Sequence, residues 1–282
     1  MSGTLYIVAT PIGNLEDITL RALRILKEVD LIAAEDTRHT KTLLSTYNIR
    51  TSLTSYHDHN EKTKAHALVA RLKQGENVAL VSDAGTPTLS DPGFRLVQEA
   101  IQQGIPVVPV PGPSALTAVL SASGLPTDHF VFEGFLPVKK RERREKLSRL
   151  REEIRTLVFF EAPHRLKESL EDLLEILGDR EVAVGREVTK VYEEFLHGRL
   201  SELSAQVEPR EMRGEITLVV RGAEKDRDRD RGRDILLAEI ERLQKKGFRV
   251  KEIAEVLGEK FSCSKREIYR LVLSEAKNNI IS

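Results

Sequence analysis

Short apolar runs alternate with longer amphipathic stretches over the first 112 residues. The apolar runs predict strands, at residues 5–9, 31–34, 78–81 and 107–110. The stretches between them carry apolar residues at helical spacing and predict helices, over residues 19–29, 40–47, 60–74 and 92–103. Strands that are apolar along their whole length and separated by helices indicate a parallel sheet covered on both faces. We therefore expect a doubly wound parallel α/β domain over residues 1–113.

The order of elements changes in the next stretch, which we assign to a second α/β domain over residues 114–223. Strand-like runs occur at residues 130–133, 156–161, 182–184, 191–196 and 216–220, with helical stretches over residues 139–155 and 163–177. Three of these strand-like runs crowd into the last 40 residues of the domain, which favours antiparallel pairing. The second domain is therefore expected to hold a mixed sheet.

The end of the chain differs in composition from the two α/β domains. Residues 224–234 contain no apolar side chain and are expected to form a charged linker. Three short amphipathic segments follow within residues 235–282, a pattern typical of a small helix-turn-helix unit. Residues 235–277 hold ten Lys or Arg against seven Asp or Glu. This mildly basic unit could bind RNA or serve packing and dimerisation.

The overall charge limits the partners that the chain can hold. It has 44 Lys and Arg against 44 Asp and Glu, so its net charge is zero. We therefore do not expect it to bind nucleic acid through its overall charge. Segment 139–155, however, carries nine positive against four negative side chains, which could form a local RNA footprint or simply a solvated helix face. A single cysteine excludes an internal disulfide, and the start of the chain predicts no secretory signal, so we expect a cytoplasmic protein. No metal is expected, because His57-Asp58-His59 lacks further ligands at matching spacing.

Loops rich in glycine, proline and small polar residues follow four of the expected strands of the first domain. They are Thr10 to Asn14, Glu35 to Arg38, Ser82 to Gly93 and Pro111 to Ala115. Ligands of doubly wound sheets bind beyond the carboxyl ends of the strands, where these loops should meet. Neither a Gly-x-Gly-x-x-Gly nor a Walker sequence occurs, so the chain lacks the usual cradle for a dinucleotide or triphosphate.

The loops also carry a family resemblance. Seven ordered segments match in sequence and spacing: residues 8–15, 34–40, 81–87, 111–115, 160–165, 185–190 and 213–217. Together they resemble the tetrapyrrole methylase superfamily of S-adenosylmethionine-dependent methyltransferases. Within it, the chain is similar to the branch that methylates the 2'-hydroxyl of a cytidine in 16S rRNA, at the decoding region of the small ribosomal subunit.

This resemblance implies a homodimer of two-domain subunits, with S-adenosylmethionine in the cleft between the domains of each. The family's cofactor contacts map onto Pro11, Gly13, Gly85, Thr86, Leu89, Ser114, Ala115, Glu161, Ala162, Glu215 and Ile216. The partner it implies is 16S rRNA, within the assembled small subunit.

Two departures separate the chain from the porphyrin-modifying relatives. The first loop has only Gly13, where their loop is richer in glycine, and Gly85-Thr86-Pro87 stands where they often carry Gly-Asp-Pro. Both departures argue against a tetrapyrrole substrate.

A ribose hydroxyl is a poor nucleophile and gains from a nearby base or stabilising charge. Residues at expected strand ends could supply that help: Asp36, Asp83, Lys190 and Glu194. Candidates for contacts with RNA phosphates are Arg38, Lys139, Lys140, Arg143, Arg144, Arg165 and Arg186.

Three functions remain open from the sequence. The leading hypothesis is an RNA ribose 2'-O-methyltransferase. One alternative is a methylase of a small tetrapyrrole-like acid, and the other is a regulator without enzymatic activity whose tail binds nucleic acid. The basic segment favours RNA over a tetrapyrrole, and the set of cofactor loops disfavours a regulator.

Overall fold

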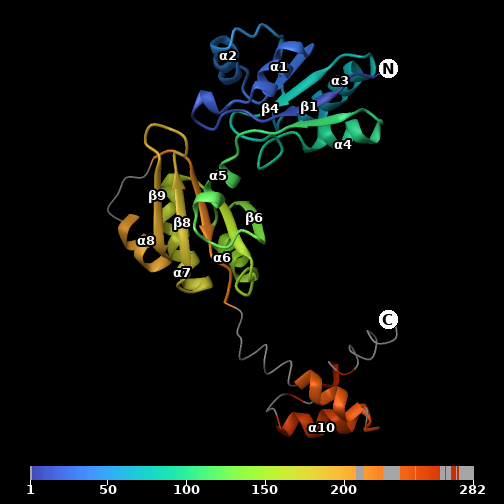
Figure 1. The fold of residues 1–282 in the computed structure, drawn as a ribbon, viewed down its shortest axis with the longest axis vertical. Coiled ribbons are helices and arrows are strands. Elements are labelled where there is room, and N and C mark those ends of the chain that lie inside the picture. The colour runs from blue at the N-terminus through green and yellow to red at the C-terminus, as the bar shows by residue number, and fades with distance from the viewer. Residues whose placement is uncertain are drawn as a thin grey trace. The chain divides into compact units, whose positions relative to one another are not determined.

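The computed structural model describes residues 2–207, 213–224, 236–244, 246–260, 264, 268–270 and 272. Contacts divide the chain into two compact units, residues 1–223 and residues 224–282 (Figure 1). The first unit holds two five-stranded sheets, one all-parallel and one mixed. The expected α/β class is therefore confirmed.

The first sheet is parallel throughout, with strand order β3-β2-β4-β1-β5. Its strands are β1 (Leu5–Val8), β2 (Leu31–Ala34), β3 (Leu53–Ser55), β4 (Val78–Val81) and β5 (Val107–Val110). β2 and β4 are buried along their whole length, which explains their uninterrupted apolar sequence. The edge strand β3 was not predicted, because its short Leu-Thr-Ser sequence lacks that pattern.

Helices cover both faces of this sheet. They are α1 (Leu20–Glu28), α2 (Thr37–Thr46), α3 (Glu61–Lys73) and α4 (Phe94–Gln102), with a 3-10 turn at Leu15–Asp17. α1 and α2 contribute to one apolar core, and α3 and α4 contribute to the other. α2 begins three residues earlier than expected, because the Asp36 side chain accepts a hydrogen bond from the backbone N–H of Arg38 and caps the helix.

The second sheet is mixed, as predicted, with strand order β6-β7-β10-β8-β9. Its strands are β6 (Phe130–Phe135), β7 (Thr156–Glu161), β8 (Glu181–Arg186), β9 (Glu194–Arg199) and β10 (Ile216–Val220). β6 and β7 run parallel, and every other pair in the sheet is antiparallel.

The helices of the second sheet are distributed unequally between its faces. They are α5 (Ala115–Ala122), α6 (Lys140–Arg149), α7 (Leu166–Leu177) and α8 (Leu200–Val207), with a 3-10 turn at Pro163–Arg165. α5 packs in a small core on one face, whereas α6, α7 and α8 contribute to the larger core on the other. α6 is shorter than the expected helix over residues 139–155: it ends at Arg149, and the backbone N–H groups of Leu150 and Glu153 donate to carbonyls three residues earlier, as in turns.

The second unit has an apolar core of its own. Residues 236–244 and α10 (Val250–Lys260) are helical, and so are the described residues at 268–270 and 272. Their buried side chains include Ile240, Leu243, Ile253 and Leu257. Most of the expected linker, residues 225–234, lies outside the described residues.

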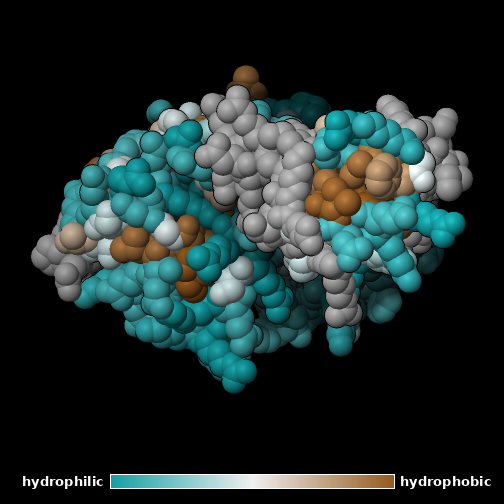
Figure 2. All heavy atoms as spheres, turned by 90° about the horizontal axis from the view of Figure 1, so that it is seen from below, coloured by the Kyte–Doolittle hydropathy of each residue, from teal (hydrophilic) through white to brown (hydrophobic). Residues whose placement is uncertain are grey.

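In the described part of the chain, no helix is long and apolar enough to cross a membrane. The visible described surface is mostly hydrophilic, with small hydrophobic areas between polar ones (Figure 2).

Candidate functional site

A cavity of about 390 Å³ opens between the two α/β domains of the first unit. Its first-domain wall consists of Ile12, in the loop after β1, and of residues in the loops that follow β2 and β4. Its second-domain wall consists of residues 160–163 at the end of β7 and residues 214–217 at the start of β10. Ser114 and Ala115, at the start of α5, complete the lining together with Phe135. Both domains are therefore needed to form the cavity.

Most of the residues expected to contact a cofactor lie in the wall of this cavity. They are Gly85, Thr86, Leu89, Ser114, Ala115, Glu161, Ala162, Glu215 and Ile216. Pro11 and Gly13 lie outside the lining. Gly13 instead packs against Lys190, and a Cβ at Gly13 would lie 2.3 Å from the Cγ of that lysine.

The loop after β4 adopts a backbone that few side chains tolerate. Gly85 has φ +81°, and it exchanges two backbone hydrogen bonds with Thr10, of 2.9 and 3.0 Å. Thr88 and Ser90 also have positive φ, an uncommon conformation for residues other than glycine. This part of the loop forms a wall of the cavity, and such outliers cluster at functional sites.

Three carboxylates gather at one part of the cavity wall: Glu35, Asp83 and Asp91. The backbone N–H of Asp83 donates to Glu35 Oε2 at 3.4 Å. Burial raises the pKa of Glu35 and raises that of Asp91 to about 6, with the other two carboxylates adding to the shift at Asp91. A carboxyl group with a pKa near 6 can accept a proton close to neutral pH.

The four expected catalytic residues differ in position. Asp83 lines the cavity, whereas Asp36 lies outside the lining, where its carboxylate binds the Arg38 guanidinium at 2.7 Å. Those hydrogen bonds hold the pKa of Asp36 well below its usual range. Glu194 also lies outside the lining and pairs with Arg186 at 3.1 Å.

Lys190 does not line the cavity, but it contacts a residue that does. Its Nζ lies 2.9 Å from Glu187 Oε1 and 3.5 Å from Glu215 Oε2, and Glu215 lines the cavity. Burial works against the charged form, but the two carboxylates outweigh it and raise the pKa of Lys190. A lysine held as a cation can stabilise negative charge but is not a base.

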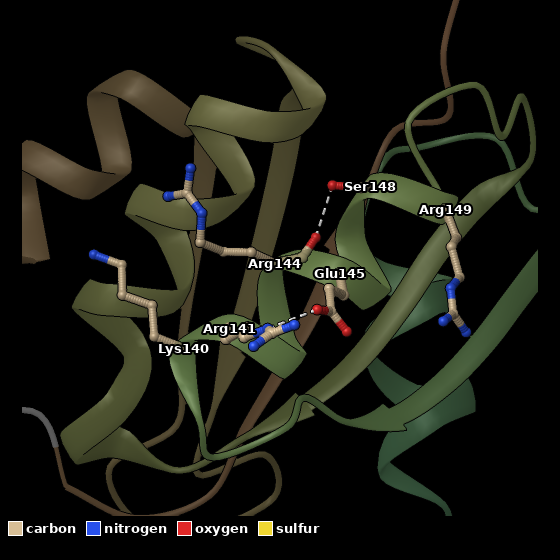
Figure 3. A pocket seen from close by; sticks show the side chains of 6 residues that line it. All are labelled: Lys140, Arg141, Arg144, Glu145, Ser148 and Arg149. Atoms are coloured by element: carbon tan, nitrogen blue, oxygen red, sulfur yellow. Dashed lines mark hydrogen bonds and ion pairs between the residues drawn. The ribbon is translucent and has the colours of Figure 1, made fainter.

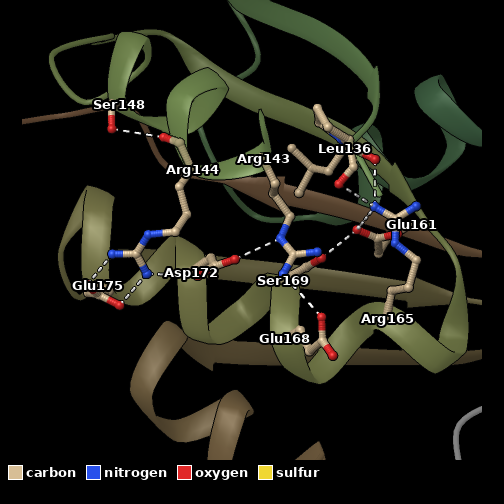
Figure 4. Close-up of polar contacts among 11 residues, drawn as sticks. Leu136, Arg143, Arg144, Ser148, Glu161, Arg165, Glu168, Ser169, Asp172 and Glu175 are labelled. Atoms are coloured by element: carbon tan, nitrogen blue, oxygen red, sulfur yellow. Dashed lines mark hydrogen bonds and ion pairs between the residues drawn. The ribbon is translucent and has the colours of Figure 1, made fainter. Parts of the chain in front are cut away.

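A buried polar network supports the second-domain wall (Figure 4). Glu161 accepts hydrogen bonds from the Ser169 hydroxyl at 2.5 Å and from the backbone N–H of Ala162 at 2.8 Å. Arg165 pairs with Glu161 and donates to the backbone carbonyls of Leu136 and Pro137. Arg165, expected to contact RNA, is thus engaged within the protein.

The structure corrects one expected RNA contact. The side chain of Arg143 is fully buried, where its Nε donates to Asp172 at 2.7 Å and one Nη lies 3.2 Å from Glu168 (Figure 4). A buried guanidinium cannot reach a phosphate on another molecule. The neighbouring Arg144 is also paired, with Asp172 and Glu175 of α7.

Three other basic residues of α6 remain at the surface. Lys140, Arg141 and Arg149 are exposed and line a surface pocket of about 710 Å³ (Figure 3). We call these three residues the exposed α6 cations. Of the other candidates, Lys139 pairs with Glu142 at 3.1 Å and Arg38 with Asp36.

Sequence reasoning missed several parts of the cavity wall. Glu35 and Asp91 lie in loops that were noted, but nothing in their local sequence distinguishes them from solvated acids. Phe135 and Phe160 line the cavity from β6 and β7. Within the described residues, no group of three or more His, Cys, Asp or Glu could hold a metal ion.

Comparison with known proteins extends these observations. Residues 4–204 match the family model described as Tetrapyrrole (Corrin/Porphyrin) Methylases. The chain is 48% identical over 276 residues to "Ribosomal RNA small subunit methyltransferase I" of Halalkalibacterium halodurans, covering 97% of this chain and 96% of that protein. It is 52% identical over 222 residues to the protein of the same name from Thermotoga maritima, covering 79% of this chain and 100% of the relative. The solved structure of a cobalt precorrin-4 methyltransferase shares the fold, with a TM-score of 0.58 and 17% identity over 77% of this chain and 94% of that one.

Proposed function

We propose, from the premise that this chain belongs to the tetrapyrrole (corrin/porphyrin) methylase family, that it methylates RNA of the small ribosomal subunit with S-adenosylmethionine as the donor. The acceptor in this proposal is the 2'-hydroxyl of a cytidine in 16S rRNA, within the decoding region. The cavity between the domains carries the proposal, because it brings most of the expected cofactor contacts together with a group of carboxylates. The relatives of 45–54% identity are named for ribosomal RNA, which favours RNA over a tetrapyrrole as the substrate.

The lining of the cavity fits the proposed cofactor. Its volume of about 390 Å³ lies in the range of small-molecule sites. Leu89, Ala115 and Ile216 offer apolar surface for an adenine ring, and a Cβ at Gly85 would lie 3.4 Å from Cγ2 of Ile12, another wall residue. The carboxylates of Glu35, Asp83 and Asp91 favour a ligand that carries positive charge, as the sulfonium and ammonium groups do.

Methyl transfer from a sulfonium needs alignment and a way to remove one proton. S-adenosylmethionine, when bound, would supply a methyl group attached to a positively charged sulfur. When the S–CH3 bond breaks, the rest of the cofactor would leave as a neutral thioether. The ribose O2' forms the new C–O bond, and its proton passes to a carboxylate of the cavity wall. We propose that Asp83 or Asp91 accepts this proton. The pKa of Asp91, about 6, suits a base near neutral pH.

Lys190, the cation beside the cavity wall, has a role other than proton transfer. Lys190 holds Glu215, a wall residue, and is a positioning residue in this proposal. Asp36 and Glu194 are engaged with arginines outside the lining, so we assign them no part in proton transfer.

The RNA contacts are proposed for the exposed α6 cations. These side chains can meet phosphates without first leaving a buried pair, in contrast to Arg143. We further propose a homodimer, and binding of the assembled subunit rather than naked RNA, because a chain of zero net charge gains little from nonspecific attraction.

The decisive experiment measures methyl transfer to small ribosomal subunits that lack the modification. Digestion to nucleosides and mass spectrometry should reveal 2'-O-methylcytidine only when protein and S-adenosylmethionine are both present. The matched control is a subunit reconstituted with 2'-deoxycytidine at the target position, which lacks the proposed nucleophile. Methylation of the deoxy substrate would place the methyl group on the base and refute the proposed acceptor.

A further inference from the structure

The loop between β8 and β9, residues 187–193, carries two exposed apolar side chains, which we call its tip. Val191 is 92% exposed and Tyr192 is 73% exposed, which places them among the most exposed large apolar residues of the described chain. An exposed aromatic ring has an unfavourable contact with water and can gain by packing against a flat partner.

The base of this loop is firmly held. The Glu187 backbone N–H donates to the Glu215 carbonyl at 3.0 Å, and the Glu187 side chain accepts from Lys190 Nζ at 2.9 Å. The backbone N–H of Thr189 donates to the Glu193 carboxylate at 2.6 Å. These contacts fix the base of the loop while its tip extends into solvent.

The loop also closes against the first α/β domain. The backbone N–H of Asn14 donates to Thr189 Oγ1 at 3.1 Å, and Gly13 packs against the Lys190 side chain. Lys190 in turn reaches Glu215 in the cavity wall. The loop therefore bridges the two domains, and Tyr192 lies two residues after a lysine that contacts the cavity wall.

We propose that the Tyr192 ring stacks on an unpaired RNA base next to the nucleotide that is methylated. This inference rests on the proposed function. A cavity of about 390 Å³ that holds S-adenosylmethionine has no room for a run of nucleotides, so those that flank the target must lie outside it. Proteins recognise unpaired RNA by stacking bases on aromatic side chains. Because the base of the loop is already ordered, little conformational entropy is lost on binding.

A second copy of the chain is a poorer occupant of this tip. A stable protein interface buries about 800 Å² on each partner, so two side chains by themselves could not hold a second copy at this tip. A single base has the size and the flat shape that one tyrosine ring can cover.

The test compares three variants of one residue: Tyr192→Ala, Tyr192→Phe and Tyr192→Leu. Loss of one stacked base should raise the KM for small ribosomal subunits by roughly 5- to 100-fold in the Ala variant. S-adenosylmethionine affinity, measured by isothermal titration calorimetry, should stay unchanged. The Phe variant should behave like the wild type, whereas the Leu variant should behave like the Ala variant, because only an aromatic ring stacks. Ile101→Ala is the control, since Ile101 is an exposed apolar residue on α4, outside the cavity wall.

The outcomes separate this inference from the proposed function. Wild-type protein that fails to methylate RNA contradicts the proposed function, and the inference falls with it. Active wild type together with an unchanged KM in the Ala variant, or a Leu variant equal to wild type, overturns the stacking role alone. A change of oligomeric state in the Ala variant, measured by sedimentation velocity, would make the tip a protein interface and would also overturn it.

Discussion

Arg143 offers the sharpest test of how the second domain is held together. Its guanidinium is fully buried between α6 and α7, bound to Asp172, which is itself buried, and to Glu168. Arg143→Met keeps an unbranched apolar stem but removes the guanidinium and its charge. Removing one partner of a buried ion pair costs about 3–5 kcal/mol, because the other charge is left uncompensated. Asp172 keeps a 3.0 Å contact with Arg144, so we expect the lower end, about 3 kcal/mol.

Urea unfolding followed by far-UV circular dichroism measures this loss. With a slope of about 3 kcal/mol per M, the midpoint should fall by about 1 M. The control is Arg141→Met on the same helix, where the side chain is 90% exposed and pairs with Glu145 at the surface. That change should cost less than about 0.5 kcal/mol.

A double variant distinguishes lost charge pairing from lost packing. Arg143→Met with Asp172→Leu removes both charges and should recover most of the stability, since apolar replacements of buried ion pairs are often neutral or stabilising. The reasoning is refuted if Arg143→Met costs less than about 1 kcal/mol, or if the double variant is no more stable than the single one.

The cavity and surface give three further predictions. Gly85→Ala and Gly104→Ala both place a side chain at positive φ and should each lose about 1 kcal/mol of stability, but only the change at the cavity wall should weaken S-adenosylmethionine binding in calorimetry. Equal affinity in both variants would remove that loop from the cofactor site. Because the folded-state pKa of Asp91 is raised from 3.8 to about 6, its ionisation destabilises the fold as pH rises through that window. Asp91→Asn should therefore be neutral at pH 4 and stabilising by about 1–2 kcal/mol at pH 7.5 in thermal melts, after allowance for solvent screening, and a pH-independent difference would contradict the raised pKa. Replacing the exposed α6 cations with glutamine should weaken RNA binding and lower its salt dependence by about one unit of slope per lost phosphate contact, and an unchanged slope in filter-binding titrations would exclude this surface.

Local sequence was enough to predict four of the five strands of the first sheet and the edge at which its loops meet. The buried strands β2 and β4 are apolar at every position, a pattern that a parallel sheet covered on both faces requires. Parallel strands direct their carboxyl ends to one edge, so the loops beginning at Glu35 and Ser82 had to meet there. Those loops form part of the cavity wall.

Local sequence misled where the outcome depended on distant partners. Along α6, Arg143 resembles its exposed neighbours, but the fold places Asp172 of α7 beside it and buries both. The start of α4 was also predicted two residues too early: the helix begins at Phe94, after Gly93 with φ +137°, and not at residue 92. In both cases the surrounding fold outweighs a local preference.

Tertiary structure alone decided the path of residues 187–193 and the environment of Asp91. The expected strand over residues 191–196 is instead β9 over Glu194–Arg199, because residues 187–193 turn outward and bridge to Asn14. The raised pKa of Asp91 likewise needs burial, together with the nearby carboxylates of Glu35, Asp83 and Asp58. Hydrophobic periodicity shows which face of a helix or strand is buried, and it therefore predicted four strands of the first sheet. It carries no record of which charged side chains meet across elements far apart in sequence, and those contacts arise only when each domain folds.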